Sequence, residues 1–264
     1  MKGIGNMKNN KLFIIITGAI IGLVAVLLVK FGNPANMGFC IACFIRDTAG
    51  ALKLHSAPIV QYIRPEIIGL VLGAAVMAFS KKELIARSGS NPLVRFVLGF
   101  FVMVGALMFL GCPLRMMLRI GGGDLNAIVG LVGFVGGILL GILALNKGFS
   151  LNRSYKVSNA ESYVFPVIQI IFLVLLVGVP SVLVFSQEGP GSMHAPVIIA
   201  LAAGLLVGAL AQRTRFCTVA GIRDSIMFKD FSMLYGFIVL IVVTIVVNLI
   251  FGFFNPGFEG QPVA

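Results

Sequence analysis

The residues most capable of chemistry in this sequence are four cysteines. Cys40 and Cys43 form a C-x-x-C pair, whereas Cys112 and Cys217 stand singly. A C-x-x-C pair alone is a weak signal for zinc binding or dithiol redox chemistry. Because a zinc site would need further paired ligands, we expect neither a metal site nor another cofactor.

Cys112 belongs to a Gly-Cys-Pro-Leu-Arg run that is typical of a helix start. We expect Cys112 at the N-cap and Pro113 at the first helical position, where the missing N–H of proline has no cost. The thiol then meets the positive end of the helix dipole, and Arg115 adds a full positive charge one turn later. This combination predicts an anion site made of backbone N–H groups, an arginine and a soft sulfur.

The other motif is repeated within the chain. Residues 39–47 align without gaps to residues 216–224 and share Phe, Cys, Ile, Arg and Asp, so Cys40 corresponds to Cys217. Position 43 is alanine in the second copy, which makes Cys43 the cysteine least expected to be essential. The shared charged residues are Arg46, Asp47, Arg223 and Asp224. Two interpretations carry equal weight: each Arg-Asp pair fixes the geometry of the repeat, or each arginine contacts a ligand.

The elements that position these motifs are membrane helices. Hydrophobic residues make up 59% of the chain and charged residues 11%, where about 25% is usual for soluble domains. The net charge of +11 is spread over many loops, so no nucleic-acid surface is expected. No phosphate loop, dinucleotide fingerprint or catalytic triad is recognisable, and we do not expect an enzyme.

A helix needs about 20 apolar residues to cross a bilayer, which predicts an all-α integral membrane protein with about seven transmembrane helices. The expected spans are residues 12–29, 64–80, 93–110, 125–145, 163–185, 195–211 and 231–254. Three shorter segments, residues 37–54, 112–120 and 214–229, are expected to be re-entrant helices. Each of these begins at or close to a cysteine.

The basic residues predict which side each loop faces, because short cytoplasmic loops are rich in Lys and Arg. With the N-terminus inside, the cytoplasmic segments contain Lys2, Lys8, Lys11, Lys81, Lys82, Arg87, Arg95, Lys147, Arg153 and Lys156. The outer loop 186–194 contains none. We therefore expect a multi-pass protein of the cell membrane, the inner one where two are present, with a cytoplasmic N-terminus.

Counting crossings gives the two repeat copies opposite orientations. An inverted repeat is typical of transporters whose site lies at mid-membrane between broken or re-entrant helices. The chain is thus one membrane domain, residues 1–264, with a first repeat at 12–150, a connecting helix and outer loop at 151–194, and an incomplete second repeat at 195–264. The second copy of the Cys112 motif would fall at about position 289, so we expect a truncated or split form of a longer protein.

These motifs together resemble the YeeE/YedE sulphur-transport family, most closely its YedE branch of selenium transporters. The resemblance rests on Cys40 and on residues 111–115 and 215–224, and it covers nearly the whole chain. It implies an inverted-repeat helical fold with short helices meeting at mid-membrane, and thiosulfate importers are among its members. It also implies that Cys40, Cys112 and Cys217 line the substrate path.

The expected function is uptake of a small sulfur- or selenium-containing anion, passed between cysteines, in a lipid bilayer. Thiols interact weakly with soft sulfur or selenium atoms and can exchange with them. One alternative is a membrane thiol-redox or sulfur-carrier protein with a cytoplasmic sulfur-acceptor partner. Another is a chain that is inactive, or that works only with a separately encoded C-terminal half.

Overall fold

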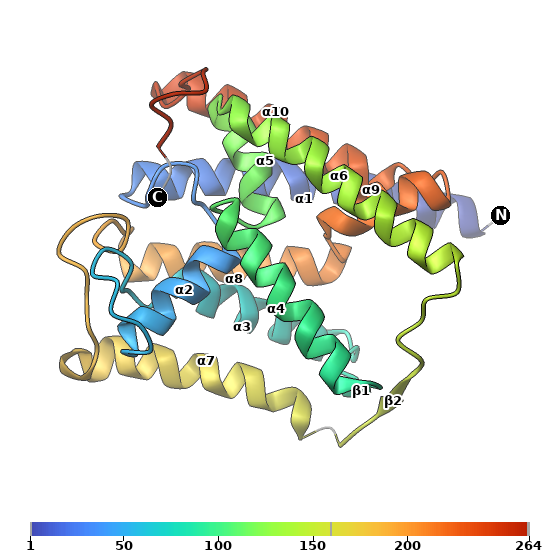
Figure 1. The fold of residues 1–264 in the computed structure, drawn as a ribbon, viewed down its shortest axis with the longest axis horizontal. Coiled ribbons are helices and arrows are strands. Elements are labelled where there is room, and N and C mark those ends of the chain that lie inside the picture. The colour runs from blue at the N-terminus through green and yellow to red at the C-terminus, as the bar shows by residue number, and fades with distance from the viewer. Residues whose placement is uncertain (1, 159, 263–264) are drawn as a thin grey trace.

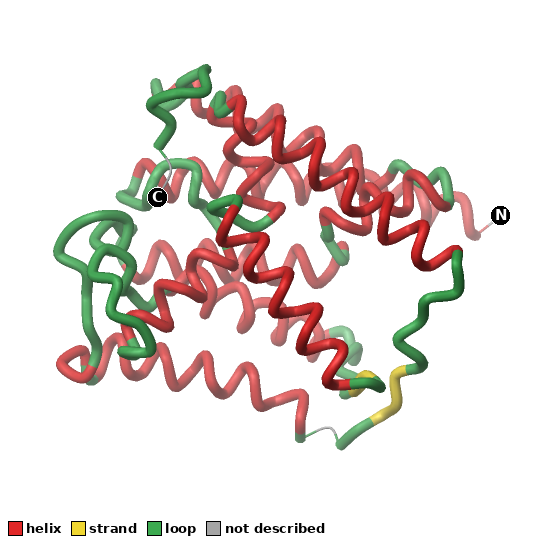
Figure 2. The backbone as a smooth tube through the Cα atoms, in the orientation of Figure 1, coloured by secondary structure: helices red, strands yellow, loops and turns green. Residues whose placement is uncertain are grey.

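The computed structural model describes residues 2–158 and 160–262 and consists almost entirely of helices (Figure 1 and Figure 2). The helices are α1 (Lys2–Lys30), α2 (Ile41–Ala51), α3 (Pro65–Ser80), α4 (Pro92–Met108), α5 (Pro113–Gly122), α6 (Leu125–Asn146), α7 (Glu161–Gly178), α8 (Val197–Thr214), α9 (Thr218–Met227) and α10 (Ser232–Phe251). Strand β1 (Arg87–Gly89) and strand β2 (Ser154–Lys156) form one antiparallel pair, and Pro180–Val182 is a 3-10 turn. Residues 1, 159 and 263–264 and the side chains of residues 2–10, with the expected cytoplasmic Lys2 and Lys8, lie outside the described part.

Six segments are long and apolar enough to cross a membrane. They are Lys11–Lys30, Pro92–Gly122, Leu125–Asn146, Glu161–Gly178, Val197–Met227 and Ser232–Phe251. The expected span 64–80 is the apolar helix α3, whose 16 residues extend only about 24 Å, against a hydrocarbon core of about 30 Å. Helix α4 has no buried residue in the described structure, although its sequence is strongly apolar, as expected for a helix in contact with lipid. The chain is therefore an all-helical, membrane-embedded protein.

The three short segments form the helices expected from their cysteines. Helix α2 has 11 residues and helices α5 and α9 have 10 each, so none is long enough to cross a bilayer alone. Their N-cap residues are Cys40, Cys112 and Cys217. Pro113 occupies the first turn of α5, which confirms the predicted helix start. Each cysteine thiol consequently lies at the positive end of a helix dipole.

One local prediction was wrong. The expected span 163–185 ends at Gly178, because Pro180 cannot continue the helix, and a 3-10 turn follows. The expected cytoplasmic segments also contain a strand pair that was not predicted, which runs in register from Arg87 opposite Lys156 to Gly89 opposite Ser154. The strand pair ties the end of the α3–α4 connection to the α6–α7 connection.

Two close helix pairs make up the packed centre: α3 with α8, and α1 with α10. Both rest on glycines that bring the two backbones into contact. A Cβ atom at Gly73 or Gly208 would overlap the backbone of the facing helix, and the same holds at Gly18 and Gly22 of α1. Small residues allow this approach, which is a common way to hold membrane helices together without a hydrophobic driving force.

Glycines at helix crossings and glycines on open helix faces should respond differently to substitution by alanine. Gly208→Ala places a methyl group against the backbone of Leu70, and we expect it to destabilise the protein by about 2 to 3 kcal/mol. Gly137→Ala is the matched control, because nothing lies within 4 Å of its added Cβ and alanine favours helices by about 1 kcal/mol. Thermal unfolding in detergent should show a lower midpoint for the first variant only; equal midpoints would contradict the tight α3–α8 crossing.

Candidate functional site

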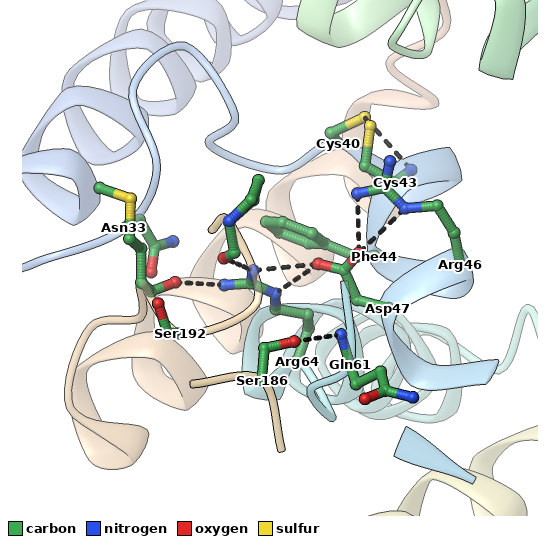
Figure 3. A network of polar contacts seen from close by, with 12 residues as sticks. Asn33, Cys40, Cys43, Phe44, Arg46, Asp47, Gln61, Arg64, Ser186 and Ser192 are labelled. Atoms are coloured by element: carbon green, nitrogen blue, oxygen red, sulfur yellow. Dashed lines mark hydrogen bonds and ion pairs between the residues drawn. The ribbon is translucent and has the colours of Figure 1, made fainter. Parts of the chain in front are cut away.

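Three cysteines from two helix starts form one buried group, which we call the sulfur cluster: Cys40, Cys43 and Cys112. The Sγ atoms of Cys40 and Cys43 lie 2.8 Å apart, and the Cys43 amide donates to the Cys40 sulfur at 3.4 Å. The Cys112 side chain packs in the same buried cluster, together with Met37, Phe44 and Ile67. Figure 3 shows the Cys40 and Cys43 side chains next to each other at the start of α2. All four cysteines of the chain are free thiols.

The first turns of α2 and α5 converge on this cluster. The backbone amides of Ile41, Leu114 and Arg115 lie close to the Cys112 sulfur, so both helices direct N–H groups towards it. N–H groups and dipoles at helix starts favour negative charge. The surroundings of Cys112 thus suit a thiolate or the anionic end of a ligand.

Arg115 supplies the only full positive charge that donates to a cluster sulfur among the described residues. Its side chain is completely buried, and Nη1 donates to the Cys43 sulfur at 3.1 Å and to the carbonyl of Leu110. Its Nε donates to the carbonyl of Asn36 at 3.3 Å. Within the described part of the chain, the Nη2 atom has no hydrogen-bond partner. A buried N–H group without a partner is costly, so this atom is a donor available to a ligand.

Arg46 and Asp47 belong to a neighbouring network (Figure 3). The buried Asp47 carboxylate accepts from Arg46 through Oδ1, at 2.8 and 3.1 Å, and from Arg64 through Oδ2, at 3.0 and 3.1 Å. Arg64 also donates to the carbonyls of Pro190 and Met193. Asp47 therefore holds Arg46 and Arg64 together, and both of its carboxylate oxygens are occupied.

Cys217 lies outside the sulfur cluster and is exposed. In the same helix, Arg223 forms the ion pair with Asp224 at 2.8 Å, but both side chains are partly exposed, at 44% and 30%. The two copies of the repeated motif thus form the same local pair in different surroundings. Of the predicted path cysteines, the structure brings Cys40 and Cys112 together and adds Cys43, which the repeat had ranked last.

A large apolar groove lies between the residues that flank Cys112 and helix α9. Its volume is about 980 Å³, and it is lined by α4, α6, the start of α5 and two residues of α9. Gly111 and Pro113, which flank Cys112, are among its lining residues, as is Arg223. The groove therefore connects the surroundings of Cys112 to the one arginine of the second motif copy.

Several buried polar groups were not predicted as site residues. Arg119 donates to Asp124 at 2.6 Å, and Asn33 donates to Glu66 at 2.6 Å. Charged residues within apolar segments are functional candidates by default, and that signal could have identified Glu66 at the start of an expected span. Asn33 carries no comparable sequence signal, because a neutral amide in a loop is common.

The chain was compared with protein-family models, with curated proteins and with solved structures, and no match was found. Within the described residues, no group of three His, Cys, Asp or Glu side chains is arranged to hold a metal ion. The chemistry of the site is therefore argued from its own residues.

Proposed function

We propose that the protein is a membrane transporter for a small sulfur- or selenium-containing anion such as thiosulfate. The observation that carries this proposal is the meeting of three buried thiols, two helix starts and the unpartnered Nη2 of Arg115. An oxyanion end suits the N–H donors, and a terminal sulfur or selenium suits the polarisable thiols. Few other small ligands would use both kinds of group at once.

The helix packing supports an inverted repeat. Helices α1 and α3 flank the first cysteine helix, and α8 and α10 flank the second, so a two-fold relation exchanges the pair α1–α10 with the pair α8–α3. Gly18 and Gly22 of α1 face α10, while Gly204 and Gly208 of α8 face α3 with the same four-residue spacing. In this proposal α3 is a short transmembrane helix that adds to the six long segments to make seven spans, and α2, α5 and α9 are re-entrant.

The groove supports a path through the protein. We place the anion first at the sulfur cluster, and then in the groove beside Gly111 and Arg223, where Val219 is the other lining residue of α9. The start of α1 and the strand pair lie at one end of the molecule in Figure 1, and loops 52–64 and 183–196 lie at the other. This arrangement supports a cytoplasmic N-terminus, since Lys11 and the basic connections 81–95 and 147–156 share one side, and loop 183–196 at the other end has no Lys or Arg.

The test is flux through the protein alone. Proteoliposomes containing the purified chain should accumulate labelled thiosulfate faster than empty liposomes, and unlabelled thiosulfate inside should accelerate exchange. Sulfate, which has the charge but no terminal soft sulfur, should compete poorly, because it cannot use the thiols. Uptake no faster than in empty liposomes would contradict the proposal.

A second candidate function is a membrane thiol-redox or sulfur-carrier protein. The observation that favours it is the short distance between the Cys40 and Cys43 sulfurs, 2.8 Å, at a helix start. This function predicts a labelled persulfide on one of these cysteines, passed to a cytoplasmic acceptor without net flux. Mass spectrometry of protein treated with a persulfide donor separates it from transport, because a transporter moves label across the membrane without retaining it.

A further inference from the structure

Glu66 is a fully buried carboxyl that none of the preceding roles uses. It lies in the first turn of α3, with no exposed surface. Its Oε1 accepts from Asn33 Nδ2 at 2.6 Å, but Oε2 has no hydrogen-bond partner among the residues that the structure describes. A buried carboxylate is expensive unless it is paired, and a single amide hydrogen bond compensates only part of that cost.

The charged and titratable groups around Glu66 do not neutralise it. Arg64 is a nearby cation, but its guanidinium is directed to Asp47 and to two backbone carbonyls. His194, from the segment before α8, also lies close and is exposed to solvent. Its ring stacks on Tyr62, with 4.3 Å between the ring centroids. Burial, reinforced by the Glu66 carboxylate, raises the pKa of Tyr62 to about 12, so the phenol remains neutral.

Glu66 also links its own helix to the loop before Cys40 and to the start of α8, and the first two of these elements border the sulfur cluster. Asn33, which donates to it, lies in the loop that leads to Cys40, and the Oδ1 of Asn33 accepts from the amide of Ala195 at 2.8 Å. The next residue, Ile67, packs in the cluster itself. The strength of the Asn33 bond depends on whether Glu66 is ionised, because hydrogen bonds to charged acceptors are about twice as strong. The charge on Glu66 therefore acts on the loop before Cys40 and on the start of α8.

We propose that Glu66 is a proton-binding site whose protonation is coupled to anion binding at the sulfur cluster. The Oε2 atom takes a proton from hydronium on the aqueous side near His194: one O–H bond forms on the carboxyl, one O–H bond of the hydronium breaks, and water is left. A bound anion adds negative charge near Arg64 and Arg115, and the proton compensates for it. The coupling rests on the proposed transport function, in which the anion then moves together with a proton.

Proton binding is tested without transport by infrared pH-difference spectroscopy of the purified protein. Acidification should produce a carboxylic-acid C=O band at high frequency, typical of a buried acid with few hydrogen bonds. Glu66→Gln should remove this band, and Glu188→Gln, at an exposed loop position, should keep it. In case Glu66→Gln does not fold, Asn33→Ala leaves the carboxyl in place and should move the pH at which the band arises. A band unaffected by both Glu66→Gln and Asn33→Ala overturns the assignment.

Coupling is tested in proteoliposomes by the ratio of labelled thiosulfate uptake with an acid-outside gradient to uptake without one. With a gradient of one pH unit, one coupled proton can raise thiosulfate accumulation at most about tenfold. For the wild type and for Glu188→Gln we therefore expect a ratio of about three or more. Glu66→Gln should have a ratio of about one. A wild-type ratio retained by Glu66→Gln refutes the coupling. Absence of any wild-type flux refutes the transport function instead, and the infrared result then decides proton binding by itself.

Discussion

Replacing Cys112 by serine is expected to reduce thiosulfate uptake at least about tenfold, a loss of about 1.4 kcal/mol or more in binding or transit. The substitution separates chemistry from folding. Cys112 is the N-cap of α5, and serine is among the preferred N-cap residues, so the helix start should remain intact. What is lost is the polarisable sulfur beside Cys40, at the point where the starts of α2 and α5 converge.

The measurement is initial uptake of labelled thiosulfate by proteoliposomes with equal amounts of folded protein. Met117→Leu is the matched control, because Met117 is buried on the same short helix but packs in a different cluster. Such a volume-conserving change costs less than about 1.5 kcal/mol and should leave uptake close to that of the wild type. If Cys112→Ser transports as fast as Met117→Leu, the sulfur of Cys112 does not contact the anion.

Replacing Asp47 by alanine is expected to destabilise the protein by about 3 to 5 kcal/mol, because it leaves a buried arginine without its counter-ion. Arg64 is completely buried and pairs with Asp47 at 3.0 Å. Its guanidinium also lies over the Phe44 ring, 4.8 Å from the centroid, so it cannot turn to solvent without disturbing α2. Thermal unfolding in detergent should show a large fall in the midpoint, together with reduced yield.

The repeated motif supplies the control. Asp224 occupies the position of Asp47 in the second copy, but its pair with Arg223 is partly exposed, so Asp224→Ala should cost no more than about 1 kcal/mol. The same substitution in the same motif thus has two different expected effects, because Asp47 is buried and pairs with two arginines, whereas Asp224 is partly exposed and pairs with one. Equal losses of stability in both variants would show that the Arg64–Asp47 pair contributes no more than a surface pair.

Much of the fold follows from local properties of the chain. Hydrophobic length predicts the long helices, and proline and cysteine at the start of α5 predict where that helix begins. The short helices were predictable for the same reason, because an apolar run of ten residues cannot cross a bilayer. Six of the spans expected from the sequence correspond to long helices, and the error at Gly178 came from a proline whose effect is also local.

The membership of the candidate site was only partly predictable. The Cys112 motif and the C-x-x-C pair were recognisable as chemistry, but their contact depends on how α5 packs against α2, which no spacing along the chain encodes. From the repeat, Cys217 was expected in the site and Cys43 was ranked last. In the structure Cys43 lies in the buried sulfur cluster, whereas Cys217 is exposed and lies outside it. Correspondence between two sequence segments predicts similar local structure, whereas burial depends on the helices that cover each segment.

By itself, then, the sequence determined the class of protein, the helix starts at cysteines and the existence of two related Arg-Asp motifs, because these depend on hydrophobicity and short-range spacing. Only the tertiary structure decided which motif is buried, which arginine donates to a sulfur, and that Glu66 has one oxygen without a partner. The physical reason is that burial and hydrogen bonding in this chain join residues that are distant in sequence. Arg115 reaches Cys43, and Asn33 connects Glu66 to the start of α8.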